Sequence, residues 1–363
     1  MRVVLAGGGT AGHVVPAVAL AHALDRDEVL FLGTAKGAEA RLVPAAGFRL
    51  ETIDVRGFDR SKPLSLVATG ARALTAIGSA RRALRRFAPD VVVGMGGYVS
   101  LPACVAARTL GVPIVLHEQN IVFGLANRVC MPLARTVAVS FEATVGQAGA
   151  RGVFVGNPVP PEIASFDRDI LRAGALRRFE LDPARRTLLV FGGSQGATRI
   201  NQAASALPRV WGERADRQVL HITGTRDLGW VSERVATTHG ALLYRVVGYV
   251  ERMTEAYACA DLALCRGGAT TLAELGVVGL PAIIVPYPHH RDRQQELHAR
   301  VFERAGAAAM MPDEDTTEDA VAAAADDLLE DDGRLAAMGS AARALGRPRA
   351  ASALAALVRE AAA

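Results

Sequence analysis

The feature that most constrains the fold is a repeated order of buried apolar runs and helical stretches. The first half opens with VVLAGGGTAGHVVP, residues 3–16, and the second with TLLVFGGSQGA, residues 187–197. In each half an apolar run enters a glycine-rich loop. Apolar runs alternating with helices predict parallel, doubly wound sheets. We therefore expect an α/β protein with two Rossmann-like domains whose parallel sheets face a cleft.

The apolar runs also predict where the strands lie. They are expected at Val3–Ala6, Val29–Leu32, Val91–Val93, Ile114–Leu116 and Thr136–Ser140, and in the second half, after Thr187, at Val219–Thr223, Leu242–Val246, Asp261–Cys265 and Ala282–Val285.

Proline and glycine mark the expected join between the two halves. The stretch GNPVPPEIASF at 156–166 holds three prolines and a Gly-Asn-Pro turn signal. We expect a first domain over 1–160, a second over 161–345, and a C-terminal helix over 346–363 that can return to the first domain. A length of 363 residues suits two cores.

Composition places the chain in a reducing compartment. The four cysteines are scattered without a C-x-x-C pair. Neither a signal peptide nor an uninterrupted apolar run of about 18 residues is visible. We expect a soluble, cytoplasmic protein.

Charge is uneven along the chain. Residues 1–160 hold 17 Lys and Arg against 10 Asp and Glu, whereas the remainder holds 24 against 27. A basic first half indicates contact with an anionic partner, although ordinary surface charge explains the same imbalance.

The first glycine loop matches G-x-G-x-x-G at Gly7, Gly9 and Gly12, the pattern of dinucleotide-binding enzymes. Such a site needs a carboxylate at the end of the second strand, to bind the ribose hydroxyls. That strand ends at Leu32–Thr34, where the sequence has none. A nicotinamide enzyme is therefore only a minor alternative.

A better nucleotide site is expected at CRGGATTLAEL, residues 265–275. Gly267 and Gly268 leave a strand, and Ala269–Thr271 open a helix whose free N–H groups attract a phosphate. Glu274 lies one turn further on, where a carboxylate can accept hydrogen bonds from a ribose diol. The alternative is that Thr270 or Thr271 caps the helix and Glu274 completes a capping box.

Polar side chains follow two further strands. Gln294 and Gln295 carry amides that can donate to and accept from sugar hydroxyls. The alternative is that both are simply exposed residues of a helix. The run HEQN, His117–Asn120, ends a buried strand in the first half.

Seven motifs in order carry a family resemblance. They are GGGTAGH, GMGGYVS, HEQN, GNP, GGSQGA, CRGGATTLAE and DRQQ, between residues 7 and 295. Together they resemble the MurG family, which transfers GlcNAc from UDP-GlcNAc to undecaprenyl-pyrophosphoryl-muramoyl-pentapeptide in peptidoglycan synthesis.

The resemblance implies a GT-B fold and transfer to the 4-hydroxyl of the muramoyl sugar, with inversion, no cofactor and no essential metal. It implies a peripheral protein on the cytoplasmic face of the cell membrane. Its partners would be UDP-GlcNAc, the lipid-linked muramoyl-pentapeptide and an anionic membrane surface, with no nucleic acid.

By position, the resemblance also implies site residues. The donor would contact Thr10, Ala11, Gly12, Asn120, Ser194, Val250, Ala269, Thr270, Thr271, Leu272, Ala273, Glu274, Gln294 and Gln295. The acceptor would contact Gly96, Gly97 and Tyr98.

One position departs from the family pattern. An arginine usually follows GNPV, but this chain has Pro160. Arg266, Arg168 or Arg199 would replace it, or the helix terminus and loop amides would suffice.

Other signals indicate structure rather than metal binding. D-x-D triplets begin at Asp25, Asp167 and Asp313, and the third reads as a helix start. His289, His290 and His298 lack a completing set of ligands and are expected in the cleft or on the surface.

An inverting transferase needs a base for the acceptor hydroxyl. His13 is the first candidate, because imidazole titrates near neutral pH, and Glu118 is the second. A purely positional role for His13, at the helix start or on a phosphate, is the alternative.

The stretch 64–87 is expected to form a helix with an apolar stripe, and its arginines lie off that stripe. Such a helix suits an anionic membrane surface, or the stripe packs on the sheet while the arginines are solvated.

Three other functions stay open on sequence alone. They are a transferase with a diacylglycerol or sterol acceptor, a UDP-sugar epimerase, and a nucleotide-sugar-binding subunit without catalysis.

Overall fold

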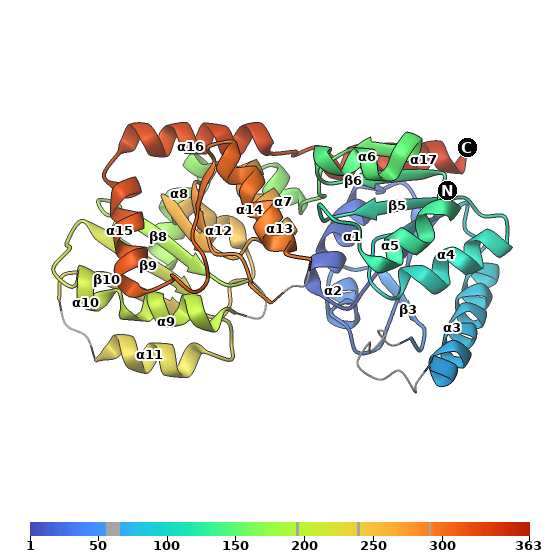
Figure 1. Ribbon diagram of the computed structural model, residues 1–363, viewed down its shortest axis with the longest axis horizontal. Coiled ribbons are helices and arrows are strands. Elements are labelled where there is room, and N and C mark those ends of the chain that lie inside the picture. The colour runs from blue at the N-terminus through green and yellow to red at the C-terminus, as the bar shows by residue number, and fades with distance from the viewer. Residues whose placement is uncertain (56–65, 194–195, 238–239, 290–291) are drawn as a thin grey trace. The chain divides into compact units, whose positions relative to one another are not determined.

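In a computed structural model the chain divides into two compact units, and the structure describes residues 1–55, 66–193, 196–237, 240–289 and 292–363. Unit 1 comprises Met1–Pro161 and Arg347–Ala363, and unit 2 comprises Glu162–Gly346. Within the described residues, each unit is built around one parallel sheet (Figure 1). The predicted α/β class with two Rossmann-like domains is therefore confirmed.

The sheet of unit 1 has the order β3-β2-β1-β4-β5-β6-β7, which extends the Rossmann order by one strand. Its strands are β1 (Arg2–Ala6), β2 (Glu28–Gly33), β3 (Arg49–Thr52), β4 (Val91–Gly94), β5 (Ile114–Glu118), β6 (Thr136–Val139) and β7 (Gly152–Phe154).

Helices cover both faces of this sheet. They are α1 (Ala11–Ala23), α2 (Glu39–Ala45), α3 (Leu66–Phe87), α4 (Ser100–Thr109), α5 (Leu125–Cys130), α6 (Val145–Ala148) and α17 (Ala350–Ala362), with 3₁₀ turns at Met131–Leu133, Glu142–Thr144 and Gly149–Arg151. Because side chains alternate along a strand, Val4 and Ala6 share a core with α3 and α4, while Val3 and Leu5 share one with α1 and α17.

The C-terminal helix belongs to unit 1. Leu354 and Val358 of α17 are fully buried in the core around Val3 and Leu5. Asp27 forms ion pairs with Arg359 of this helix at 3.0 Å and with the Met1 amino group at 3.0 Å. The last residues of the chain thus complete a hydrophobic core formed by the first.

Replacing Leu354 by alanine is expected to lower the free energy of unfolding by about 2–5 kcal/mol, because the change leaves a cavity in a closed core. Urea unfolding followed by circular dichroism measures this. Glu360→Ala, on the exposed side of α17, is the matched control and should change stability by less than about 0.5 kcal/mol. Equal stabilities for the two variants would contradict the packing of α17.

The sheet of unit 2 has the order β10-β9-β8-β11-β12-β13. Its strands are β8 (Arg186–Phe191), β9 (Arg217–Ile222), β10 (Leu243–Val247), β11 (Leu262–Cys265), β12 (Ala282–Ile284) and β13 (Ala308–Met310). The helices are α7 (Pro161–Ala164), which spans the unit boundary, α8 (Arg168–Arg178), α9 (Thr198–Ala206), α10 (Pro208–Trp211), α11 (Leu228–Ala236), α12 (Met253–Cys259), α13 (Ala269–Val278), α14 (Gln294–Arg304), α15 (Glu318–Leu329) and α16 (Asp332–Leu345).

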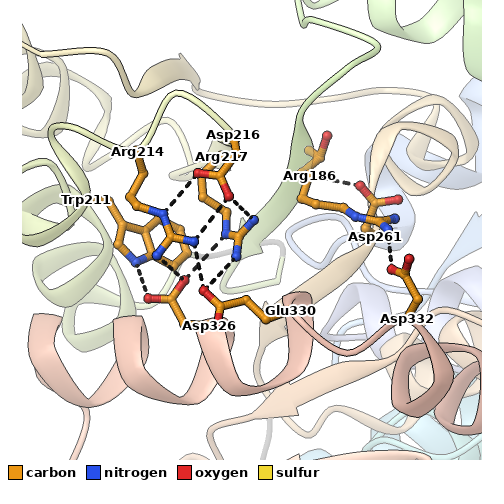
Figure 2. A network of polar contacts seen from close by, with 10 residues as sticks. Arg186, Trp211, Arg214, Asp216, Arg217, Asp261, Asp326, Glu330 and Asp332 are labelled. Carbon is orange, nitrogen blue, oxygen red and sulfur yellow. Dashed lines mark hydrogen bonds and ion pairs between the residues drawn. The ribbon is translucent and has the colours of Figure 1, made fainter.

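A polar network attaches α15 to the N-terminal end of β9 (Figure 2). The nearly buried Arg217 pairs with Asp326 and Glu330 of α15 at 3.4 and 3.3 Å. Trp211 donates from its indole nitrogen to Asp326 at 3.0 Å. Because these groups satisfy one another, a buried arginine is tolerated at the amino end of the sheet.

Three strands escaped prediction, namely β3, β7 and β13. Each lies at an edge of its sheet, is three or four residues long, and is largely half-exposed or exposed. Edge strands bury less apolar surface than central ones, and these three have the sequences RLET, GVF and AAM in place of the runs rich in Val, Ile and Leu that identified most of the others.

The predicted stripe on 64–87 is only partly buried. Ala80 and Leu84 of α3 are in the core, whereas Leu74 is 72% exposed. Arg82, Arg85 and Arg86 are exposed. Leu64 lies outside the described residues. Within the described part of the chain, every helix is too short or too polar to cross a bilayer.

Candidate functional site

In unit 1 the expected site residues gather where β1, β4 and β5 end. These strands are neighbours and parallel, so the loops that follow them lie at one edge of the sheet. The two glycine loops touch. A Cβ added at Gly97, where φ is +75°, would lie 2.5 Å from the carbonyl oxygen of Gly8. Glycine is thus required where the loops cross.

His13 occupies the first turn of α1 and packs over the second glycine loop. A Cβ at Gly96, where φ is +87°, would lie 2.9 Å from Nδ1 of His13. Burial lowers the pKa of His13, and the charge of Glu118, together with smaller effects of which the charge of Glu39 is the least, opposes this only in part. The imidazole is therefore neutral at pH 7 and able to accept a proton. Its Nδ1 is buried and has no hydrogen-bond partner among the described residues.

Glu118, the second candidate base, is buried and already engaged. Its Oε1 accepts hydrogen bonds from the backbone and side-chain nitrogens of Asn120 at 3.0 and 3.1 Å. Its Oε2 accepts from the backbone of Gly124 at 3.0 Å and from Nδ2 of Asn127 at 2.9 Å. With both oxygens occupied, the carboxylate holds the loop after β5 and orients the amide of Asn120.

The remaining residues of HEQN connect this loop to its neighbours. Burial lowers the pKa of His117 to about 4, and its Nε2 lies 3.1 Å from the carbonyl oxygen of Gly156 in the GNP turn. Gln119 donates to the carbonyl of Met95 in the second glycine loop at 3.2 Å. These side chains hold three loops together rather than face solvent.

Leu32–Thr34 contain no carboxylate, as expected, but a carboxylate from the next helix reaches this end of β2. Glu39, in the first turn of α2, folds back to accept from the backbone nitrogen of Thr34 at 2.9 Å. The strand sequence gives no signal for it, because Glu39 lies five residues beyond Thr34 on the next helix. The carboxylate points into the protein, where it also accepts from Gly9.

In unit 2, α13 begins where the donor motif predicted a helix start. Gly268 is its N-cap, in extended conformation and without a side-chain cap, so the capping role considered for Thr270 and Thr271 was wrong. The first N–H groups of a helix have no partner within the helix. This terminus, at the carboxyl end of β11, has the geometry that favours an anion.

Glu274 is half-buried on α13, six residues beyond the N-cap. Its Oε2 accepts from the hydroxyl of Tyr257 at 2.6 Å. Burial raises the pKa of Glu274 to about 7, and the charge of Glu162 adds to this while the Tyr257 bond opposes it. Tyr257 had no signal in the sequence, because it comes from α12.

Gln295 braces the turn before α13. Its Oε1 accepts from the backbone nitrogens of Gly267 at 3.1 Å and Tyr287 at 3.0 Å. This orients the amide so that its nitrogen points away from both donors. Gln294 is buried and donates to Asp292 at 3.2 Å, and Val250 is buried between β10 and α12. Ser194 lies outside the described residues.

The arginines considered as replacements at Pro160 are all engaged. Arg266 pairs with Asp313 at 2.5 Å, Arg199 donates to the carbonyl of Glu314 at 2.7 Å, and Arg168 pairs with Asp261 at 2.6 Å. Asp261 precedes β11 and so lies at the opposite end of that strand from the donor motif. With these three arginines engaged, the N-terminus of α13 is the remaining candidate for the positive charge beside a phosphate.

The D-x-D carboxylates and the histidines have structural contacts. Asp167 caps α8 through the nitrogens of Asp169 and Ile170, while Asp27 and Asp313 form the ion pairs described above. His298 lies 3.0 Å from the carbonyl of Gly267. His290 lies outside the described residues.

Comparison with known proteins agrees with this architecture. The glycosyltransferase family 28 N-terminal domain matches residues 3–139, and the family 28 C-terminal domain matches residues 187–354. The crystal structure of Acinetobacter baumannii MurG is similar over 99% of both chains, with a TM-score of 0.78 and 27% identity. A UDP-GlcNAc 2-epimerase from Neisseria meningitidis, bound to UDP-GlcNAc, shares the fold with a TM-score of 0.70 over 99% of this chain and 100% of that one, at only 12% identity.

The fold and the two matched family 28 domains place the chain among the two-domain α/β glycosyltransferases of the GT-B type. A curated relative from Nocardioides sp. is 45% identical over 95% of this chain and 94% of its own length. One from Acidothermus cellulolyticus is 44% identical over 100% of this chain and 98% of its own. Both are named UDP-N-acetylglucosamine–N-acetylmuramyl-(pentapeptide) pyrophosphoryl-undecaprenol N-acetylglucosamine transferases, and this chain belongs to their family, the MurG family.

Proposed function

We propose that this chain transfers GlcNAc from UDP-GlcNAc to the 4-hydroxyl of the muramoyl sugar of undecaprenyl-pyrophosphoryl-muramoyl-pentapeptide, with inversion, in peptidoglycan synthesis. The observation that carries the proposal is the identity of 44–45% with the relatives named for this reaction, over nearly the whole chain. The alternative of an epimerase rests on a likeness of fold at 12% identity.

Unit 2 holds the donor in this proposal. The diphosphate binds at the N-terminus of α13, through Ala269–Thr271, with Ser194 beside it. Glu274 accepts hydrogen bonds from the ribose diol, and the backbone of Val250 contacts the uracil. The free nitrogen of Gln295, with Gln294, meets the GlcNAc hydroxyls.

Unit 1 supplies the acceptor site and the base. The loop Gly96–Tyr98 binds the acceptor, while Thr10–Gly12 and Asn120 approach the donor sugar and phosphates. His13 accepts the proton of the muramoyl 4-hydroxyl as that oxygen attacks the anomeric carbon. The bond from the anomeric carbon to UDP breaks, and the leaving diphosphate takes the electron pair, opposite the positive end of α13. Glu118 positions Asn120.

The test supplies the purified full chain with UDP-GlcNAc and a lipid-linked muramoyl-pentapeptide. A disaccharide-lipid product with release of UDP is expected. Conversion of UDP-GlcNAc to its 2-epimer without acceptor would establish the epimerase instead. Tight UDP binding without product or epimer would indicate a binding subunit, and transfer only to a diacylglycerol or sterol would indicate a different acceptor class.

We further propose that unit 1 docks on the cytoplasmic face of the membrane through α3. The support is a helix that presents Arg82, Arg85, Arg86 and Leu74 to solvent while Ala80 and Leu84 hold it on the sheet. Such a surface attracts anionic head groups and requires no apolar residue to leave the core.

Changing Arg82, Arg85 and Arg86 to glutamine is expected to weaken binding to anionic vesicles on the order of 10²-fold, because each basic residue near the surface adds about 1 kcal/mol. Sedimentation with phosphatidylglycerol vesicles measures this. Turnover on a short-chain, water-soluble acceptor should be unchanged.

The control removes the same charge from exposed positions of unit 2, at Arg177, Arg209 and Arg334. It should leave vesicle binding largely intact. Equal losses in both variants would point to net charge alone, and no loss in the α3 variant would place docking elsewhere.

A further inference from the structure

One carboxylate in unit 1 takes part in neither proposed substrate site. The side chain of Glu39 is buried, with the residue 1% exposed. It accepts from the backbone and hydroxyl of Thr34 at 2.9 and 2.8 Å, and from the backbone nitrogen of Gly9 at 2.8 Å. A buried carboxylate is expensive unless its oxygens are paired, and these bonds pair both.

Three glycines make room for this single side chain. A Cβ added at Gly33 would lie 2.6 Å from Cγ of Glu39, and one added at Gly8 or Gly37 would overlap its carboxyl group. Gly8 belongs to the loop after β1, and Gly33 and Gly37 flank the turn after β2. The absence of side chains at these positions leaves the space that Glu39 occupies.

The hydrogen bond to Gly9 connects Glu39 with the proposed base. Gly9, at φ +96°, directly precedes the N-cap of α1, and His13 lies in the first turn of that helix. On the other side of Gly9, a Cβ would lie 3.2 Å from the ring of Tyr98. The hydrogen bond to Glu39 and the ring of Tyr98 thus fix the position at which the helix carrying His13 begins.

We propose that Glu39 is a positioning residue of the transfer reaction, which anchors the first glycine loop through Gly9 and so fixes the His13 imidazole over Gly96. This inference rests on the proposed function, in which His13 is the base. A dinucleotide-binding loop of the same sequence pattern leaves its N–H groups to a pyrophosphate. Here Glu39 takes the Gly9 N–H and places a negative charge beneath the loop.

The pKa of His13 provides a measurement that a purely structural role of Glu39 would leave unchanged. The charge of Glu118 of β5 and the smaller effect of Glu39 of α2 both raise the pKa of His13 against the effect of burial, and the neighbouring His117 of β5 is also titratable. Removing the charge of Glu39 therefore lowers the pKa of His13 further. The acid limb of the kcat/KM profile moves to lower pH with it.

The decisive variant is Glu39→Gln, which keeps the shape and removes the charge. We expect kcat to fall about 10- to 100-fold, as for a small misplacement of a catalytic group, while UDP affinity stays within about twofold. The acid limb should shift to lower pH. Glu39→Asp keeps the charge on a shorter side chain, and it should lose kcat while leaving the acid limb in place.

Glu28→Gln is the matched control, because Glu28 is exposed at the opposite end of β2. It should leave kcat, UDP affinity and the pH profile unchanged. A Glu39→Gln variant that loses thermal stability but keeps its kcat and pH profile would overturn the inference. A parallel loss of UDP affinity would also overturn it, because Glu39 would then act through the donor contacts of Thr10–Gly12 and not through His13.

Titration of the His13 imidazole by NMR separates this inference from the proposed function. If the wild type forms no disaccharide lipid, the proposed function fails, and the His13 pKa in Glu39→Gln still decides whether the two groups are coupled. If the wild type transfers GlcNAc and the pKa of His13 is the same in both proteins, the inference about Glu39 alone fails.

Discussion

Replacing His13 by alanine is expected to lower kcat by about 10²- to 10⁴-fold, the usual contribution of a positioned general base. UDP affinity should stay unchanged, because the proposed donor contacts of this loop come from Thr10–Gly12 and not from the His13 imidazole. The wild-type kcat/KM should keep its acid limb below pH 6.5, since burial lowers the pKa of His13 from that value. In the alanine variant this limb should disappear.

His22→Ala is the control for this experiment. His22 lies in the last turn of the same helix and is exposed, with its ring 5.0 Å from that of Phe48. Its loss should leave kcat and the pH profile as they are. Full turnover by His13→Ala with normal UDP binding would mean that the base is another group.

Replacing Glu274 by alanine is expected to weaken UDP binding about 10- to 150-fold. The ribose diol would lose a charged acceptor, which is worth on the order of 1.5–3 kcal/mol. Isothermal titration calorimetry measures the affinity, with Glu303→Ala on the exposed side of α14 as the control. Unchanged affinity would leave Glu274 as a partner of Tyr257 only.

The raised pKa of Glu274 adds two dependences on pH. Since a carboxylate accepts from the diol and a carboxylic acid does so less well, UDP affinity of the wild type should fall as the pH decreases through about 7. Glu274→Gln should bind UDP weakly without this dependence.

Stability should change in the opposite direction. A folded-state pKa of about 7, above the ordinary glutamate pKa of 4.5, gives stability that is complete below pH 4.5 and lost as the pH rises through 7. Glu274→Gln removes this penalty and should be more stable than the wild type at pH 8, by at most about 3 kcal/mol, and equally stable near pH 4.5. A lower melting temperature for the variant at pH 8 would contradict the burial of a charged Glu274.

The central strands and the class of fold could be predicted from the sequence because their signal is local. A strand buried on both faces must be apolar at every position, as in Val91–Val93, and the glycines after β1 and β8 mark tight exits into helices. The donor motif was equally local, since α13 begins at Ala269 as expected. Family membership followed from the order of such motifs along the chain.

The edge strands and the partners of the site residues were decided only by the tertiary structure. β3, β7 and β13 pair through backbone groups of a neighbouring strand, and backbone hydrogen bonds leave little trace in side-chain pattern. The sequence places Glu39 thirty residues from Gly9 and Tyr257 seventeen from Glu274, so neither hydrogen bond could be read from spacing.

The two candidate bases also show what the sequence determines and what only the tertiary structure decides. The sequence identified His13 and Glu118 as residues of suitable chemistry at the ends of buried strands. Only packing distinguishes them, because four hydrogen bonds occupy the oxygens of Glu118, whereas Nδ1 of His13 has no partner among the described residues. Residue type sets which proton chemistry is available, and the surroundings that folding brings together set which group is free to perform it.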